Sequence, residues 1–301
     1  MATNMPPHNL SEIVDATIAF IDDPEITSEG LLKFIKGPDF PTGGIIYGEQ
    51  GIRDAFETGR GRIVVRSKTE IELTHSGREC IIVTEIPYMV NKAEMIRKIA
   101  DLINDKKLEG ISYINDESDR NGMRIVIILK KDATANVVLN NLFKYSSLQT
   151  AFSVNNIALV KGRPKTLCTK DLISYFVKHR HEIIIRRAKY DLDQAEKRAH
   201  ILQGLIIASD NIDEVVAIIK ASPNADTARE RLMERFSLTD IQARAIVEMR
   251  LRQLTGLEQE KLRSEYDEVM ALIEYLKKVL ESLDLQMKII KDELLEIREK
   301  Y

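Results

Sequence analysis

The stretch that decides the fold is LRSEYDEVMALIEYLKKVLESLDLQMKIIKDELLEIREKY, residues 262–301. Its apolar residues follow one another at alternating steps of four and three, which is an a/d heptad pattern. They are Leu262, Tyr266, Val269, Ile273, Leu276, Leu280, Leu283, Met287, Ile290, Leu294, Ile297 and Tyr301. No Gly or Pro interrupts this pattern. It therefore predicts a single helix of about 60 Å, at 1.5 Å per residue.

Such a helix needs a partner, because a lone helix gains too little to hide so many large side chains. Residues 171–209 contain no Pro and a single Gly, Gly204, and repeat the four-three steps with smaller residues. These are Ala188, Leu192, Ala195, Ala199, Leu202 and Ile206. Small residues let a bulkier stripe approach closely, so we expect an antiparallel coiled coil. A stack of ordinary core helices is the alternative, although typical globular helices are much shorter.

Between the two long helices lies a run that can reverse the chain and form a small helical knob. Within it, Thr239 is a suitable N-cap, and the helix that follows carries more apolar surface than a reversal needs. We therefore expect a self-complementary dimer contact, with a private three-helix core as the alternative. The expected interface residues are Ile246, Met249, Arg250, Leu251 and Leu254.

The first part of the chain mixes helix and strand signals. Helices are expected after Asn9, from Thr27 to Ile35, from Ile52 to Glu57, after Asn91 and from Asn136 to Phe143. Strands are expected at Arg62–Leu73, Glu79–Ile86, Met123–Lys130 and Phe152–Val160. The predicted fold is an α+β head with an antiparallel sheet at residues 1–170, then an outgoing coiled-coil helix at 171–209, the knob at 210–256 and a returning coiled-coil helix at 257–301.

Composition limits the classes of protein that remain. The chain has 301 residues, with 44% hydrophobic and 30% charged residues, as in a soluble protein rich in helix. It has no apolar run long enough to span a bilayer and no secretory leader. Cys80 and Cys168 show no disulfide or metal spacing, which favours a reducing cytoplasm. Because the net charge is −3, any nucleic-acid binding must come from locally clustered Lys and Arg.

Two basic clusters stand out. The first predicts a contact with the DNA backbone: Arg60, Arg62, Arg66 and Lys68. Period-two spacing puts the last three on one strand face, and Gly59 and Gly61 would let a phosphate approach; a solvated edge strand is the alternative. The second cluster, residues 178–189, is a solvated helical face or a second surface for nucleic acid. His179 and His181 do not share a helical face, and the acids at 116–119 indicate a turn rather than a Mg²⁺ site.

Motifs along the whole chain resemble one family, the A subunit of DNA gyrase, which is a type IIA topoisomerase. They are ATN-x-PPHNL at residues 2–10, GPDFPT at 37–42, GRGR at 59–62, EIPY at 85–88, VNKA at 90–93, DESDR at 116–120, GMRIVI at 122–127, AHIL at 199–202 and LTGLE at 254–258. The A subunit of topoisomerase IV is the nearest alternative. Asn4 and the VNKA segment favour gyrase.

The resemblance implies that the head is the tower, the long helices are the antiparallel coiled coil and the knob is the dimeric exit gate. It also implies ATP-dependent passage of one duplex through a double-strand break, leading to negative supercoiling in the cytoplasm. Double-stranded DNA, a second copy of the chain and the B subunit of gyrase are the implied partners. The B subunit would bind Mg²⁺ and ATP, and no cofactor or metal is expected in this chain.

The family's nucleophilic tyrosine sits in an Arg-Tyr-Thr-Glu context that is absent here. We therefore expect an internal piece, beginning after the winged-helix domain, with no catalytic residue of its own and no activity alone. His8 and Asn9 are candidate DNA contacts because the family's cleavage domain precedes them, although helix capping is the favoured role of Asn9. Two other functions stay open: a non-enzymatic coiled-coil scaffold and a helical arm that binds structured RNA.

Overall fold

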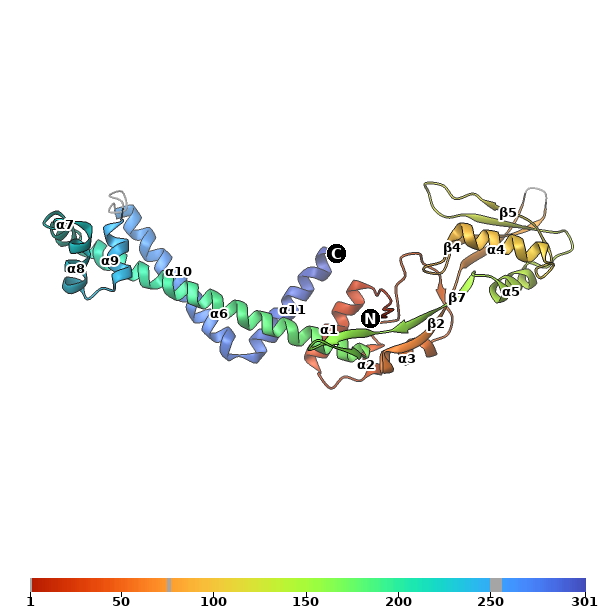
Figure 1. The fold of residues 1–301 in the computed structure, drawn as a ribbon, viewed down its shortest axis with the longest axis horizontal. Helices are drawn as coiled ribbons and strands as arrows, with labels where there is room; N and C mark the ends of the chain where they lie inside the picture. The colour runs from red at the N-terminus through yellow and green to blue at the C-terminus, as the bar shows by residue number, and fades with distance from the viewer. Residues whose placement is uncertain (1, 75–76, 250–255) are drawn as a thin grey trace. The chain divides into compact units, whose positions relative to one another are not determined.

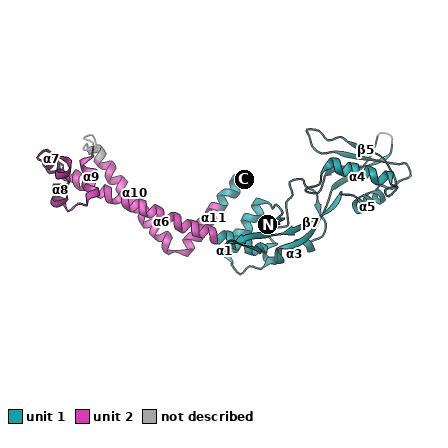
Figure 2. Ribbon diagram, in the orientation of Figure 1, with its two compact units in different colours: residues 1–177, 294–301 teal, residues 178–293 magenta. Residues whose placement is uncertain are grey.

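The computed structural model describes residues 2–74, 77–249 and 256–301, with the backbone alone for residues 256–258. Contacts divide the chain into two compact units (Figure 2). Unit 1 comprises Met1–Val177 and Leu294–Tyr301, and unit 2 comprises Lys178–Glu293. Unit 1 contains the antiparallel sheets, and unit 2 is helical, so the expected α+β class followed by long helices is confirmed. The four expected segment boundaries stay predictions.

Unit 1 contains a three-stranded antiparallel sheet in the order β1-β2-β7. Its strands are β1 (Ile45–Ile46), β2 (Arg60–Arg66) and β7 (Gln149–Asn155), and its helices are α1 (Leu10–Asp22), α2 (Ser28–Leu31) and α3 (Gln50–Thr58). Strands β2 and β7 pair along their whole length, from Arg60 opposite Asn155 to Arg66 opposite Gln149. The helix starts follow the predicted caps, because the Asn9 and Thr27 side chains accept backbone N–H bonds from Glu12 and Gly30.

A four-stranded antiparallel sheet in the order β3-β4-β6-β5 forms the other core of unit 1. Its elements are β3 (Lys68–Leu73), β4 (Glu79–Glu85), α4 (Lys92–Asn104), β5 (Ile111–Asp116), β6 (Ile125–Leu129) and α5 (Ala135–Tyr145). The expectation of one strand over Arg62–Leu73 is wrong, because buried Ser67 separates β2 from β3 and the two strands join different sheets. Strand β5 was not predicted; its residues are mostly exposed and give a weak apolar signal.

A separate two-stranded hairpin follows, formed by β8 (Ile157–Val160) and β9 (Arg163–Thr166). The expected strand over Phe152–Val160 is therefore two strands. The break falls at buried Asn156, whose N–H makes the last bond of the β2–β7 ladder, to the Gly59 carbonyl at 2.9 Å, while its own carbonyl accepts the N–H of Leu167 at 2.9 Å. Strand β9 was not predicted, because its sequence contains a Pro and two cations.

Unit 2 is built on long helices that run antiparallel. They are α6 (Thr169–Asp210), α10 (Gly256–Glu281) and α11 (Leu283–Lys300), and the outer residues of α6 and α11 belong to unit 1. Ala195 and Ala199 of α6 pack against Ile273 of α10, as the small-residue stripe predicted. Three ion pairs show the antiparallel direction, because the residue number on α10 or α11 decreases as that on α6 increases. They are Arg187–Glu293, Glu196–Lys277 and Asp210–Arg263.

The prediction of one unbroken helix over residues 262–301 is wrong. The helix breaks at Ser282, and Figure 1 shows a sharp bend between α10 and α11. The Ser282 hydroxyl accepts the N–H of Leu285 at 3.2 Å, and the Gln286 amide donates to the Val279 carbonyl at 2.7 Å. Side chains thus replace the lost helical bonds without a Gly or Pro. As a consequence Leu283, expected in the apolar stripe, is 58% exposed.

Three short helices gather at one end of α6 and α10 and form the knob (Figure 1). They are α7 (Ile212–Lys220), α8 (Ala225–Phe236) and α9 (Asp240–Val247). Thr239 caps α9 as predicted, and Gln242 completes a capping box. The Gln242 amide also donates to the His200 carbonyl of α6 at 2.8 Å. No helix in the described ranges is long and apolar enough to cross a membrane.

Candidate nucleic-acid interface

The sequence candidates Arg60, Arg62 and Arg66 lie on one face of β2. Their side chains alternate with Ile63 and Val65, which are buried on the opposite face. A strand whose apolar side is fixed in a core holds the cations of its other side in a defined register. The predicted shared face is therefore confirmed for Arg62 and Arg66, and Arg60 lies on it as well.

Two of the three arginines are available to a ligand. Arg60 and Arg62 are exposed, and across the part of the chain that the structure describes neither side chain has a hydrogen-bond or ion-pair partner. Ser153 and Asn155 of β7 lie directly opposite them in the ladder. The face therefore presents two free guanidinium groups beside neutral polar residues, which suits a phosphate backbone.

Arg66 is engaged within the protein. Its guanidinium lies 3.7 Å from the ring centroid of Tyr47 and 4.8 Å from that of Phe143, and its Nε donates to Gln149 Oε1 at 2.6 Å. Cation–π contacts of this kind hold a guanidinium in place. Because Phe143 belongs to α5, Arg66 links the three-stranded sheet to the second core of unit 1.

Lys68 does not share the arginine face. It begins β3 in the other sheet, and its ammonium group pairs with Glu85 at 3.5 Å. The prediction of a shared face is wrong for this residue because Ser67 ends the ladder.

The two glycines of the GRGR motif serve packing. A Cβ at Gly61 would lie 2.2 Å from the Gly51 carbonyl oxygen, and one at Gly59 would lie 2.3 Å from the Leu167 carbonyl oxygen. Gly59 also has a φ of 74°, which favours glycine at the end of α3. Protein backbone fills the space beside both residues, so the idea that they admit a phosphate is wrong.

His8 and Asn9 are held in structural contacts. The His8 Nδ1–H donates to the Pro6 carbonyl at 3.1 Å, and burial lowers the pKa of the imidazole, which favours its neutral form. Asn9 caps α1 at 3.2 Å and donates to Asp39 at 3.3 Å. Their DNA-binding roles stay predictions.

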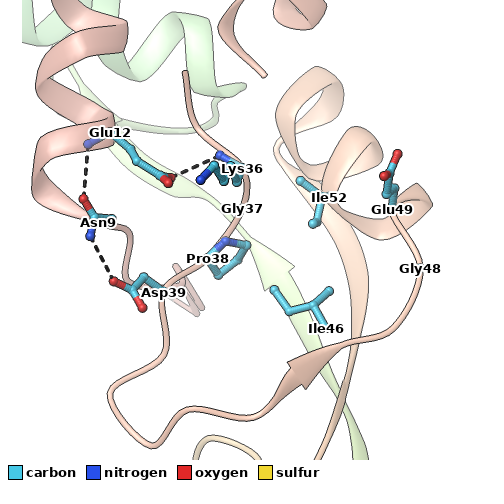
Figure 3. Close-up of a pocket in the computed structure, with 10 residues that line it drawn as sticks. All are labelled: Asn9, Glu12, Lys36, Gly37, Pro38, Asp39, Ile46, Gly48, Glu49 and Ile52. Carbon is cyan, nitrogen blue, oxygen red and sulfur yellow. Dashed lines mark hydrogen bonds between the residues drawn. The ribbon is translucent and has the colours of Figure 1, made fainter. Parts of the chain in front are cut away.

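A cavity of about 660 Å³ lies beside Asn9 (Figure 3). Its charged lining consists of three acids, Glu12, Asp39 and Glu49, and one cation, Lys36, whose backbone N–H donates to Glu12 at 3.1 Å. The carboxylates would repel a phosphate, so this hollow is a poor extension of the arginine face.

Two arginines of the basic cluster on α6 share one carboxylate within unit 2. Arg180 and Arg187 both donate to Glu293, and His181 contacts Gln286 at 2.6 Å. Burial alone would raise the pKa of Glu293, but the hydrogen bonds from Arg187 and Arg180 outweigh it and lower the pKa. This cluster therefore offers less free charge than its sequence indicates.

The expected dimer residues of the knob fall into three groups. Ile246 is 2% exposed and packs in the knob's own core, while Met249 is half-buried against the same cluster. Arg250, Leu251 and Leu254 lie outside the described residues. Ile241, at 59%, is the exposed large apolar residue of α9. The interface assignment stays a prediction.

These features define a protein with two parts in sequence, an α+β part followed by long antiparallel helices that carry a small helical knob. Comparison with known proteins identifies the family. The family model for the A subunit of DNA gyrase/topoisomerase IV matches residues 1–295. The chain therefore belongs to this family, and the resemblance seen in its motifs is confirmed.

Individual relatives match over the whole chain. The DNA gyrase A subunit of Clostridium acetobutylicum is 52% identical over 301 residues, covering 100% of this chain and 36% of that protein. That of Halalkalibacterium halodurans is 52% identical, with coverage of 100% and 36%. That of Streptococcus pneumoniae is 50% identical, with coverage of 100% and 37%. The chain thus spans little more than a third of the length of these relatives.

Proposed function

We propose that the chain is the part of a DNA gyrase A subunit that supports bound duplex DNA and carries the dimeric exit gate. In this proposal it works with the gyrase B subunit in ATP-dependent double-strand passage and negative supercoiling in the cytoplasm. Family membership and the names of the relatives support gyrase. The matching family also includes topoisomerase IV, which is the second candidate.

The observation that carries the DNA-binding proposal is the pair Arg60 and Arg62. Both cations project from the exposed face of a strand whose other face is buried. Contacts of Arg with phosphate oxygens position a protein on DNA without reading its sequence. We therefore assign these residues a supporting role along the DNA backbone, with no preference for a base sequence.

Chemistry at the DNA belongs, in this proposal, to the assembled enzyme. A tyrosine in the Arg-Tyr-Thr-Glu context does not occur in this sequence. In the described part of the chain, no group of three His, Cys, Asp or Glu side chains could hold a metal ion. We assign the binding of Mg²⁺ and ATP to the gyrase B subunit. We also expect this chain alone to form no covalent DNA adduct.

The DNA-binding proposal is tested by the salt dependence of binding to short duplex DNA. Each phosphate contact contributes about 0.9 to the slope of log K against log salt. The variant Arg60→Gln/Arg62→Gln should therefore lose about 1.8 from the slope measured by fluorescence anisotropy. Arg97→Gln/Arg120→Gln removes two exposed charges from the second core of unit 1 as a matched control. An unchanged slope in the Arg60/Arg62 variant would refute the assignment.

For the exit gate, we propose that α6 and α10 form an antiparallel coiled coil that presents the knob to a second copy. The support is the packing of small against large residues on these helices and the exposed Ile241 on α9. Met249→Glu and Ile241→Glu should each weaken the dimer in mass photometry and analytical ultracentrifugation. A chain that is strictly monomeric at tens of micromolar, before any substitution, would count against this gate.

A further inference from the structure

The β8–β9 hairpin presents a basic tip with a defined backbone geometry. Val160 pairs with Arg163, and the two residues between them, Lys161 and Gly162, have φ values of 51° and 77°. Positive φ at both positions is the signature of a two-residue type I′ turn, which fits the twist of paired strands. The hairpin is therefore a regular β-ribbon with Lys161 at its tip.

Three cations occupy this ribbon. Lys161, Arg163 and Lys165 are all exposed, and none has a hydrogen-bonding or ion-pairing side chain against it within the residues that the structure describes. The sequence contains no acidic residue between Asp132 and Asp171. The positive charge is therefore not neutralised by neighbours along the chain or in the ribbon.

Two of these cations lie on the same face of the ribbon. Arg163 and Lys165 are two residues apart, so their side chains lie on one face of β9, about 6.7 Å apart along the strand. Their cross-strand partners are Val160 and Ala158, which carry no charge. The opposite face carries Leu159, which is 63% exposed. The basic face is thus a short row of cations without competing acids.

The base of the hairpin adjoins the arginine strand. The Asn156 N–H donates to the Gly59 carbonyl at 2.9 Å, and the Leu167 N–H donates to the Asn156 carbonyl at 2.9 Å. Gly59 immediately precedes Arg60, the first residue of β2. The ribbon, which is part of unit 1, therefore begins beside the end of the strand that carries the free guanidinium groups.

The choice of lysine at the turn is unfavourable for the fold alone. Gly, Asn and Asp dominate positions with positive φ in such turns, and other L-residues there are strained because Cβ lies too close to the following carbonyl oxygen. Lys161 lacks the short polar side chain that offsets this cost by bonding to local backbone. A cation at the tip is consistent with a role in contacting an anion.

We propose that the β8–β9 hairpin is a second contact with the phosphodiester backbone of duplex DNA, made by Lys161, Arg163 and Lys165. This inference rests on the proposed function, because it extends the surface begun by Arg60 and Arg62. The contact is electrostatic and independent of base sequence. Charge complementarity and continuity with the arginine strand identify DNA as the occupant.

The test is the salt dependence of duplex binding in Lys161→Gln/Arg163→Gln/Lys165→Gln. Loss of three phosphate contacts should reduce the slope of log K against log salt by about 2.7. As salt rises from about 50 to 200 mM, the ratio of the affinity of the unaltered chain to that of the variant should then fall roughly 40-fold. Arg120→Gln/Lys130→Gln/Lys131→Gln removes the same charge from exposed loops of the second core and should leave the slope unchanged.

Two further variants separate the outcomes. The charge-preserving swap Lys161→Arg/Arg163→Lys/Lys165→Arg should keep the slope. If circular dichroism shows that the triple Gln variant unfolds at a lower temperature, Arg163→Gln alone replaces it and should lower the slope by about 0.9. An unchanged slope in the hairpin variants, with a reduced slope in Arg60→Gln/Arg62→Gln, would overturn this inference and leave the proposed function standing. Unchanged slopes in the hairpin variants and in Arg60→Gln/Arg62→Gln would overturn both this inference and the proposed function. If the loop control lost as much slope as the hairpin triple variant, the loss would not be specific to the hairpin, and this inference would be overturned.

Discussion

Replacing Gly204 with alanine should loosen the knob, although helix propensity alone predicts a gain. Gly204 lies inside α6, where alanine is favoured over glycine by about 1 kcal/mol. A Cβ at this position would lie 2.7 Å from the Cβ and 2.8 Å from the Cγ of Gln242 in α9. Gln242 is held in place, because its amide donates to the His200 carbonyl and its Oε1 accepts the Thr239 N–H.

The magnitude follows from the required movement. Ordinary contact begins at 3.4 Å, so α9 must move away from α6 by at least 0.7 Å, the difference between 3.4 and 2.7 Å. Overpacking of this kind costs about 1–3 kcal/mol, and weakening the two hydrogen bonds of Gln242 costs about 1 kcal/mol more. After subtraction of the helix gain, the knob should be destabilised by about 2 kcal/mol.

Hydrogen–deuterium exchange measures this effect locally, which matters because a chain of two units need not unfold in one step. Protection of the α9 peptide, Asp240–Val247, should fall about 30-fold in Gly204→Ala, since about 1.4 kcal/mol corresponds to tenfold. Gln203→Ala, at the exposed neighbouring position of the same helix, is the control and should change protection only slightly. Equal or greater protection of α9 in Gly204→Ala would refute the steric argument.

Two other perturbations test the bend and an ion pair. Gln286→Leu should reduce exchange protection around Ser282, because it leaves the Val279 carbonyl and His181 without their amide partner. The buried Val279 carbonyl alone should cost about 1–3 kcal/mol. If Gln286→Leu and the control Gln203→Ala showed the same exchange protection from Val279 to Ile290, Gln286 would not stabilise the bend. Hydrogen bonds from Lys92 and Ser118 lower the pKa of Asp116 to about 2. Because this folded-state pKa is depressed, the pair stabilises the protein above the ordinary pKa of 3.8, and the contribution is lost as the pH falls towards 2. Lys92→Met should therefore raise the Asp116 midpoint in a carboxyl-carbon NMR titration, whereas an unmoved midpoint would contradict the assignment to Lys92.

Local chemistry made several features predictable. Asn9, Thr27 and Thr239 cap helices at their predicted positions, because a side chain that accepts an N–H bond two or three residues later needs no distant partner. The stripe of Ala195 and Ala199 is buried for a similar reason, since helical spacing alone puts these residues on one face. The turn at Asp119 also formed, with its carboxylate accepting the Asn121 N–H at 2.8 Å.

Features that depend on distant partners were missed or misplaced. Strands β5 and β9 carry weak apolar patterns and are defined by the strands beside them. Arg66 shares the sequence pattern of Arg60 and Arg62, but two aromatic rings and Gln149 engage its side chain. Neither ring lies close to it in sequence. The spacing of the arginines in the sequence therefore could not predict which of them are free and which are engaged by other side chains.

By itself, the sequence determined the order of the parts, the helix starts, the apolar stripes and the family, because each depends on residues close together in the chain or on motifs read in order. Tertiary structure decided which arginines remain free, where β2 ends, that Gly204 admits Gln242 and that the returning helix bends at Ser282. The physical reason is that these features depend on contacts between residues far apart in sequence or on side chains substituting for backbone hydrogen bonds.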